Sequence, residues 1–232
     1  MSLKACKGAG CTHSFSFNNV FHKEFSYPSV DGIAHQVNSI IVTKIPKAEP
    51  GRPCLFLDRD GVINASPGEG YVLSPTELVL NEGIGDLLQC AHSAGWLSIV
   101  ITSQRCVGKE RIDLSMLASI HRSMQEELND RYGCCFDGIY AFTGLPGTET
   151  WQKPNPGMIE QACNDHCVAP SLSIMVGDQD RDIEMAQQAG IGSTIRVVNE
   201  AEQRSQGISA DQTVFSIAEL VPTLKNQIMA PS

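Results

Sequence analysis

A short apolar run that ends in two acidic residues lies at Cys54–Gly61 and reads CLFLDRDG. Its first four residues are all apolar, which is typical of a strand that is buried on both faces of a sheet. Asp58 and Asp60 then flank a single residue, and Gly61 allows the chain to turn sharply after them. The segment therefore predicts a central strand whose carboxyl end carries two carboxylates.

The same alternation of short apolar runs and helical patterns continues along the chain. Strand-like runs lie at Cys54–Leu57, Leu97–Ile101, Phe136–Phe142, Ser173–Val176 and Ser193–Val198. Helical patterns lie at about Gly83–Ala94, Leu114–Arg131, Gly157–Cys167, Ile183–Ala189 and Ser216–Gln227. Buried strands that alternate with helices predict βαβ units, a central parallel sheet and a three-layer α/β/α sandwich.

The composition indicates a folded chain with an acidic balance. Of the 232 residues, 42% are hydrophobic and 19% are charged, which is enough apolar surface to bury a sizeable core. The 17 Lys and Arg against 26 Asp and Glu give a net charge of −9, which argues against nucleic acid or an anionic membrane as partner. No apolar stretch reaches the roughly 20 residues of a membrane span, and the first residues lack the apolar run of a secretory signal. We therefore expect a cytoplasmic protein, either a monomer or a small homo-oligomer.

Residues 1–50 differ in amino-acid composition from the rest of the chain and are predicted to be an N-terminal extension of unknown role. They are rich in Ser, Asn, His, Phe and Gly, with one strand-like run at Val37–Ile45. The segment Pro46–Pro53 then has the composition of a linker or turn. Residues 51–232 are predicted to form the main domain.

The nine cysteines are expected to be reduced thiols. Their number is odd, and no C-x-x-C pair occurs anywhere in the chain. The nearest approach to a zinc pattern is the group Cys163, His166 and Cys167, which also fits an amphipathic helix with cysteines as small apolar residues.

Polar residues collect where the predicted strands end. The second strand ends in Thr102, Ser103 and Gln104; Lys153 lies in the loop after the third; Asp178 follows the fourth. Because the carboxyl ends of parallel strands share one edge of a sheet, these side chains are expected to meet there. The set that we expect at this rim is Asp58, Asp60, Thr102, Lys153 and Asp178.

Such a set suits the transfer of a phosphoryl group through a covalent intermediate. A carboxylate can act as nucleophile and divide a hydrolysis into two easier steps. A hard cation such as Mg²⁺, bound by carboxylates, can hold the phosphate near this anion. A lysine and a hydroxyl stabilise the phosphoryl oxygens, while a second carboxylic acid protonates the leaving oxygen.

The motifs resemble those of haloacid dehalogenase-type phosphatases. The residues that carry this resemblance are LDRDGVIN at Leu57–Asn64, Thr102, Lys153, and Val176–Asp178 with Asp182. The sequence motifs LDRDGVIN, ITSQ, FDGIY, KPNPGM and MVGD are similar to those of the D-glycero-D-manno-heptose 1,7-bisphosphate 7-phosphatases and of their histidinol-phosphatase relatives. The resemblance covers about Cys54–Val198 and implies a Rossmann-like fold.

The resemblance also implies roles for individual residues. Asp58 would be the nucleophile and Asp60 the general acid and base, while Thr102 and Lys153 would stabilise the phosphoryl group. Mg²⁺ would be bound by Asp58, the backbone carbonyl of Asp60 and Asp178, with Asp182 in support. The substrate would be a small phosphorylated metabolite. The residues expected to contact it are Arg59, Gly70, Tyr71, Ser103, Gln104, Arg105 and Gln152.

Two departures from the resembled family change these expectations. The relatives carry a zinc loop of three Cys and one His before the lysine, but Thr143–Gln152 contains neither residue type, so no zinc is expected. The relatives also place Arg directly before the lysine, where this chain has Gln152. Loss of a bidentate guanidinium weakens binding of a second phosphate, for which Arg59 and Arg105 are candidate replacements.

The spacing of the motifs predicts an open site without a large cap domain. About 40 residues separate the first two motifs and about 50 separate the second from the lysine, and the predicted helices and strand use much of both. The loop Ser66–Tyr71 is the expected cover. Tyr71 is expected either to contact the substrate or to pack on the edge of the sheet.

Other functions remain open at this point. A phosphatase acting on histidinol phosphate, on nucleotides or on nucleic-acid ends would use the same residues. A phospho-acceptor module also combines Asp, Mg²⁺, a hydroxyl and Lys, although it carries the phosphorylated Asp on its third strand. A binding protein that has lost catalysis is the remaining alternative.

Overall fold

The computed structural model describes residues 25–26, 51–145, 147–198 and 207–229. Seven strands in these residues form one sheet in the order β1-β4-β3-β2-β5-β6-β7, and every pairing is parallel. The strands are β1 (Phe25–Ser26), β2 (Cys54–Leu57), β3 (Leu97–Ser103), β4 (Gly138–Phe142), β5 (Ile174–Gly177), β6 (Ser193–Val197) and β7 (Gln212–Val214).

Five α-helices accompany the sheet in the described residues. They are α1 (Ile84–Ser93), α2 (Leu114–Tyr132), α3 (Gly157–His166), α4 (Asp180–Gln188) and α5 (Ile217–Met229). Short 3-10 helices lie at Pro75–Glu77, Glu149–Trp151 and Pro170–Leu172. None of the helices in the described ranges is long and apolar enough to cross a bilayer.

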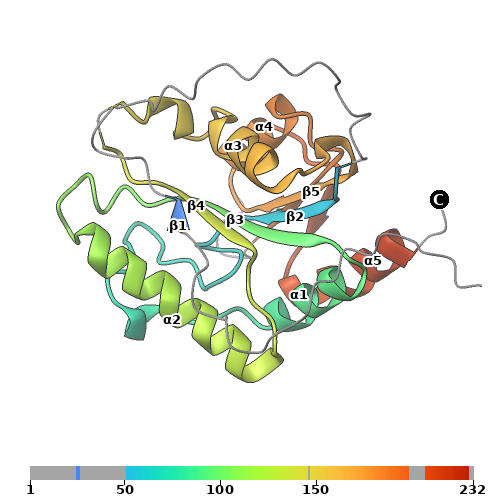
Figure 1. Cartoon of the computed structure of the whole chain (residues 1–232), viewed down its shortest axis with the longest axis horizontal. Coiled ribbons are helices and arrows are strands. Elements are labelled where there is room, and N and C mark those ends of the chain that lie inside the picture. The colour runs from blue at the N-terminus through green and yellow to red at the C-terminus, as the bar shows by residue number, and fades with distance from the viewer. Residues whose placement is uncertain (1–24, 27–50, 146, 199–206, 230–232) are drawn as a thin grey trace, which may run out of the picture.

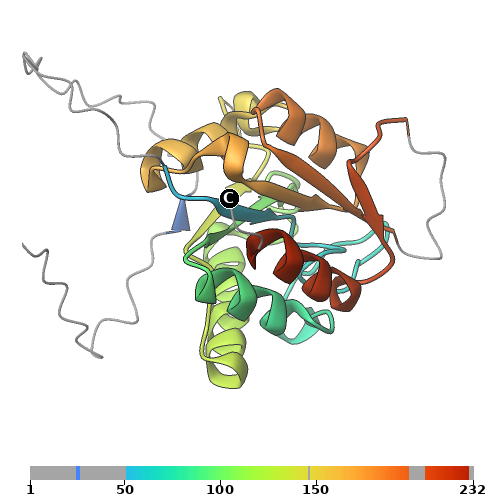
Figure 2. The same ribbon diagram turned by 90° about the vertical axis from the view of Figure 1, so that its right-hand side faces the viewer.

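The helices cover both faces of the sheet, with α3 and α4 on one side and α1, α2 and α5 on the other (Figure 1). Side chains alternate along a strand, so Leu55 and Leu57 of β2 enter the core under α1, α2 and α5. Cys54 and Phe56 enter the second core, under α3 and α4. Figure 2 shows α5, in dark red, beside α1. The predicted three-layer α/β/α sandwich is therefore confirmed.

The capping residues explain where two of the helices begin. Asp113 precedes α2, and its carboxylate accepts a hydrogen bond from the N–H of Met116. Gln179 and Asp182 form a reciprocal capping box at the start of α4. This box starts α4 at Asp180, whereas the hydrophobic pattern alone predicted a start at Ile183.

The edges of the sheet differ from the prediction. β1 and β7 were not predicted, because strands of two or three residues leave no apolar run in the sequence. β3 continues to Ser103, beyond the predicted end at Ile101. The strand predicted at Val37–Ile45 lies outside the described residues, and the division of the chain at residue 50 stays a prediction.

The connections around the site are loops, as the spacing predicted. Residues 58–83 contain one short 3-10 helix, and residues 104–113 contain neither a helix nor a strand. The expected absence of a large cap in these two stretches is confirmed. The carboxyl edge of the sheet is therefore overlaid by short segments alone in this part of the chain.

Candidate active site

The site lies at the carboxyl edge of the sheet, where β2, β3 and β5 end side by side. Leu57, the last residue of β2, lies opposite Val100 of β3 and Val176 of β5. The N–H of Asp58 donates to the carbonyl oxygen of Val176 at 3.0 Å, so the first acidic residue still follows the sheet ladder. The sheet itself thus fixes the position of Asp58.

A buried lysine joins two of the acidic residues. The Nζ atom of Lys153, from the segment between β4 and α3, lies 2.8 Å from Oδ1 of Asp58 and 2.8 Å from Oδ1 of Asp182. The Oδ2 atom of Asp182 accepts a hydrogen bond from the N–H of Gln179 at 3.0 Å. Asp58, Asp182 and Lys153 are all buried, so these contacts are shielded from water.

Burial and mutual repulsion shift the pKa values of this cluster. Burial raises the pKa of Asp58 from 3.8 to about 6, against the opposing charge of Lys153. Burial, with repulsion from Asp182 and Asp58, raises the pKa of Asp178 to about 8. Burial disfavours the charge on Lys153, but Asp182 and Asp58 outweigh it and raise its pKa. Burial likewise disfavours the Asp182 anion, yet Lys153 outweighs this effect and lowers the pKa of Asp182.

The acidic residues fit a hard divalent cation. One carboxylate oxygen each from Asp58, Asp178 and Asp182 lies within 4.8 Å of the other two. The Oδ1 atom of Asp178 is buried and has no hydrogen-bond partner among the described residues. One lysine does not balance three carboxylates, and oxygen ligands of this kind are those that Mg²⁺ prefers. In the described part of the chain, Cys163, His166 and Cys167 form no comparable group.

Gly61 is required next to this cluster by both conformation and space. Its φ of +91° is unfavourable for residues with a side chain, and a Cβ atom there would lie 2.5 Å from Oδ2 of Asp178. The turn after Asp60 can therefore pass close to Asp178 only because residue 61 is glycine.

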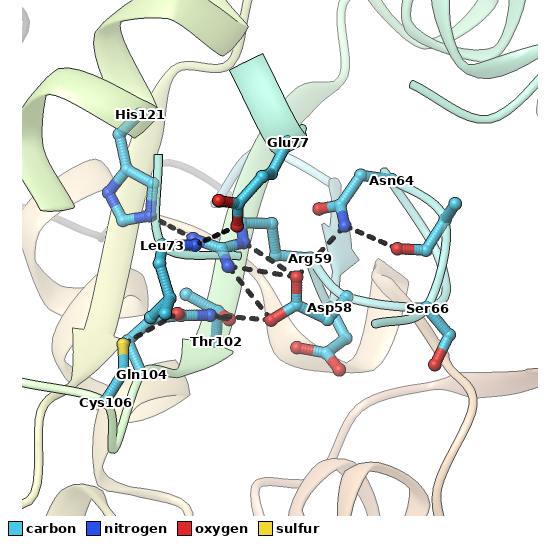
Figure 3. A network of polar contacts seen from close by, with 12 residues as sticks. Asp58, Arg59, Asn64, Ser66, Leu73, Glu77, Thr102, Gln104, Cys106 and His121 are labelled. Carbon is cyan, nitrogen blue, oxygen red and sulfur yellow. Dashed lines mark hydrogen bonds and ion pairs between the residues drawn. The ribbon is translucent and has the colours of Figure 1, made fainter. Parts of the chain in front are cut away.

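Asp60 is held in a separate network of hydrogen bonds, whose donors Arg59, Asn64 and Gln104 are labelled in Figure 3. Arg59 donates from Nε and Nη2 to Oδ1 of Asp60, at 3.1 and 2.9 Å, and from Nη2 to Oδ2 at 3.0 Å. Asn64 and Gln104 donate to the same carboxylate at 3.0 and 2.9 Å. Gln104 also donates to Oγ1 of Thr102 at 2.9 Å. The carboxylate of Asp60 thus lies outside the triad of acidic oxygens, and the expected metal ligation by its backbone carbonyl stays a prediction.

A cavity of about 550 Å³ opens in front of these residues. Its floor includes Asp58, Asp60, Thr102 and Asp178, and the loop Ser66–Tyr71 forms part of its wall. The remaining lining comes from the ends of β3 and β6 and the start of α4, namely Ser103, Gln179, Asp180, Arg181, Arg196, Val197 and Val198. A cavity of this size suits a small metabolite.

Of the residues that were expected to contact the substrate, the structure places three at the cavity and four away from it. Gly70, Tyr71 and Ser103 line the cavity, and Tyr71 also packs against the small core cluster that contains Cys106. Tyr71 thus lies at the cavity, and the cluster that it packs against lies in the loop after β3 and in α2 rather than on the edge of the sheet. Its contact with the substrate stays a prediction.

The structure places four of the expected contacts away from the cavity. Arg59 and Gln104 are fully buried and absent from the cavity wall, because their donor groups are directed at Asp60. Arg105 and Gln152 are exposed and also lie outside the cavity lining. Neither of the arginines proposed to replace the missing guanidinium of the relatives therefore faces the cavity.

Residues that sequence reasoning missed supply the positive charge instead. Arg196 of β6 is buried, and its Nη2 atom donates to Oδ1 of Asp180 and to the carbonyl oxygen of Ile208, both at 2.7 Å. Arg181 is exposed at the start of α4 and lines the cavity. A single Arg in the apolar run Ser193–Val198 was the one sequence signal for Arg196.

Comparisons with known proteins agree with this geometry. Residues 150–220 match the family described as HAD-hydrolase-like. The chain is 31% identical to the D-glycero-beta-D-manno-heptose-1,7-bisphosphate 7-phosphatase of Haemophilus ducreyi, over 74% of this chain and 98% of the relative. It is 32% identical to the D-glycero-alpha-D-manno-heptose-1,7-bisphosphate 7-phosphatase of Burkholderia mallei, over 73% and 92% respectively.

A solved structure shows the same fold. The D,D-heptose 1,7-bisphosphate phosphatase from B. bronchiseptica, complexed with magnesium and phosphate, superposes with a TM-score of 0.66 at 26% identity. The match covers 74% of this chain and 97% of that structure. Together with the acidic strand ends and the buried lysine, these matches show a phosphoric monoester hydrolase: the chain belongs to the haloacid dehalogenase-like phosphatases, in the family of the heptose-1,7-bisphosphate 7-phosphatases.

Proposed function

We propose that this chain is a Mg²⁺-dependent phosphomonoesterase that hydrolyses a small sugar phosphate, of the heptose bisphosphate type, through an aspartyl phosphate on Asp58. The observation that carries the proposal is Asp58, which lines the cavity together with Asp60 and is held from behind by its ion pair with buried Lys153. A pKa of about 6 leaves Asp58 deprotonated at neutral pH, as a nucleophile must be.

In the first half of the reaction, a carboxylate oxygen of Asp58 attacks the phosphorus atom. The bond from phosphorus to the ester oxygen breaks, and Asp60 gives its proton to that leaving oxygen. Lys153 fixes the orientation of Asp58 and contributes positive charge beside the transferred group. Thr102, which lines the same cavity, donates from its hydroxyl to a phosphoryl oxygen.

In the second half, water attacks the phosphorus atom of the aspartyl phosphate. Asp60, now ionised, takes a proton from this water, and the bond from phosphorus to the Asp58 oxygen breaks. The products are inorganic phosphate and the original carboxylate. Bound through Asp58 and Asp178, Mg²⁺ would supply positive charge that offsets the repulsion between these carboxylates and the phosphoryl oxygens.

A panel of phosphate esters tests this proposal. With Mg²⁺, we expect a strong preference for D-glycero-D-manno-heptose 1,7-bisphosphate over histidinol phosphate, other sugar phosphates and nucleotides. Chelation with EDTA should abolish release, and added Mg²⁺ should restore it, because the cluster of Asp58, Asp178 and Asp182 is left with a net negative charge. The measurement is inorganic phosphate released with time.

The other outcomes of the panel are informative. A preference for histidinol phosphate or nucleotides would keep the chemistry and replace the substrate. Release that is equally fast in EDTA would refute the requirement for Mg²⁺. No release from any ester would favour a phospho-acceptor or a binding protein.

The second phosphate of a bisphosphate substrate is expected to meet Arg181. Arg181 lines the cavity and has no hydrogen-bond or ion-pair partner in the described part of the chain, whereas Arg196 is already engaged. Replacement of Arg181 by Gln should raise KM for heptose 1,7-bisphosphate about tenfold, because a charge-assisted hydrogen bond is lost. For heptose 7-phosphate, KM should change less than about twofold, since that substrate lacks the second phosphate.

Arg105→Gln is the matched control, because Arg105 is also exposed but lies outside the cavity lining. Steady-state kinetics of both variants with both substrates should show the KM effect in Arg181→Gln alone. An equal rise in KM for the bisphosphate and the monophosphate would contradict a contact with the second phosphate.

A further inference from the structure

The network around Asp60 extends to a histidine that lies far away in the sequence. The guanidinium of Arg59 lies between the Asp60 carboxylate and the ring of His121, with Nη1 of Arg59 3.2 Å from Nε2 of His121 (Figure 3). Arg59 and His121 are both fully buried. His121 comes from α2, on the far side of Arg59 from the acid-base residue.

The chemistry of this contact defines the state of the histidine ring. A guanidinium has N–H donors and no acceptor, so Nε2 of His121 must accept and cannot carry a proton. The ring is therefore neutral and protonated on Nδ1. Burial, followed by the charge of Arg59, lowers the pKa of His121 well below its usual value, which agrees with a neutral ring.

The helix that carries His121 offers no packing reason for a polar residue at this position. The other buried residues of α2 are all apolar: Leu117, Ile120, Met124 and Leu128. A buried imidazole costs free energy unless its nitrogen atoms are hydrogen-bonded. The bond to Arg59 thus gives a histidine here a specific structural use.

We propose that His121 is a positioning residue for the acid-base step: it fixes the plane of the Arg59 guanidinium, which in turn holds the Asp60 carboxylate. Nε and Nη2 of Arg59 face Asp60, whereas Nη1 faces His121, so the guanidinium is held at both ends. Without an acceptor at residue 121, a buried N–H of Arg59 would lose its partner and the guanidinium would reorient. Among the described residues, Asn64 and Gln104 would then be the side chains that still orient Asp60. This inference rests on the proposed role of Asp60.

The test compares two substrates that differ in their need for a proton. Departure of a sugar alkoxide needs protonation by Asp60, whereas p-nitrophenyl phosphate releases a stabilised phenolate that does not. His121→Leu removes the acceptor and puts an apolar side chain at this buried position. We expect kcat/KM for heptose 1,7-bisphosphate to fall at least about tenfold, but less than about threefold for p-nitrophenyl phosphate.

His121→Gln is the conservative counterpart, because its amide oxygen can accept from Arg59. This variant should recover most of the lost kcat/KM for the heptose substrate. If His121→Leu fails to fold, the kinetics of His121→Gln and the NMR spectrum of the wild-type protein still test the role of His121. In ¹⁵N NMR spectra, the His121 ring should be protonated on Nδ1 and unprotonated on Nε2 at neutral pH.

The outcomes separate this inference from the function on which it rests. Equal losses for both substrates in His121→Leu, or a proton on Nε2, would show that His121 has a structural role alone and would overturn the inference. A wild-type protein that hydrolyses neither substrate would remove the proposed function, and the inference with it.

Discussion

Replacement of Asp58 by Asn is expected to lower phosphate release from heptose 1,7-bisphosphate by at least about 10³-fold. An amide has the shape of the carboxylate but is not a nucleophile, so no covalent intermediate can form. The measurement has two parts: steady-state phosphate release, and acid-quenched labelling of the enzyme from a ³²P-labelled ester. The wild-type protein should carry a hydroxylamine-sensitive label that Asp58→Asn lacks.

The variant should fold, because its amide oxygen can still accept from Lys153, and one fewer charge is buried beside Asp178 and Asp182. Asp130→Asn, at an exposed position of α2, is the matched control and should retain wild-type activity. Full activity in Asp58→Asn would refute the mechanism. A label on Asp58 that persists for minutes in the wild-type protein would favour a phospho-acceptor over an enzyme with turnover.

Replacement of Lys153 by Met is expected to reduce both stability and activity. The Lys153 side chain is 1% exposed, and Met fills a similar volume without a charge. Because the ion pairs with Asp58 and Asp182 are buried, loss of the cation should cost about 3–5 kcal/mol of unfolding free energy in EDTA. Activity should fall about 10²-fold, since charge beside the transferred group is also lost. Urea unfolding and phosphate release measure the two effects.

Two further measurements identify the cause of the lost stability. Mg²⁺ should restore part of it in Lys153→Met, because a bound cation again offsets the carboxylates. Adding Asp182→Asn to Lys153→Met should restore part of it without metal, because the double variant buries one fewer unpaired charge. Lys109→Met is the control: this exposed lysine lies 5.3 Å from the Tyr71 ring centroid, and its loss should cost less than about 1 kcal/mol. A cost below about 1 kcal/mol in Lys153→Met would contradict a buried ion cluster.

The predicted helices and strands came close to the observed ones where the apolar pattern was long. β2 was predicted with its observed bounds, and α2 within one residue at its C-terminal end, because burial of one face repeats along a helix or strand and is visible locally. The edge strands β1 and β7 were missed, because a pairing of two or three residues depends on the neighbouring strand. The start of α4 was missed because a capping box involves the side chains of Gln179 and Asp182.

The rim residues could be predicted because the direction of the strands brings them together. Once the sheet is parallel, Asp58, Thr102 and Asp178 must lie at one edge, whatever the details of packing. The orientation of each side chain could not be predicted in the same way. Arg59 was expected in the cavity because it lies between two site residues, yet its guanidinium points into the core.

By itself the sequence determined the order of the elements, because each helix or strand depends on a local pattern. It also determined the parallel sheet and the acidic rim, because strands that alternate with helices run parallel and end at one edge. The tertiary structure alone decided which cations face the cavity and which support the acidic residues. Arg59 and His121, for example, are 62 positions apart. No local pattern links these two residues, because their contact depends on how α2 packs against the completed sheet.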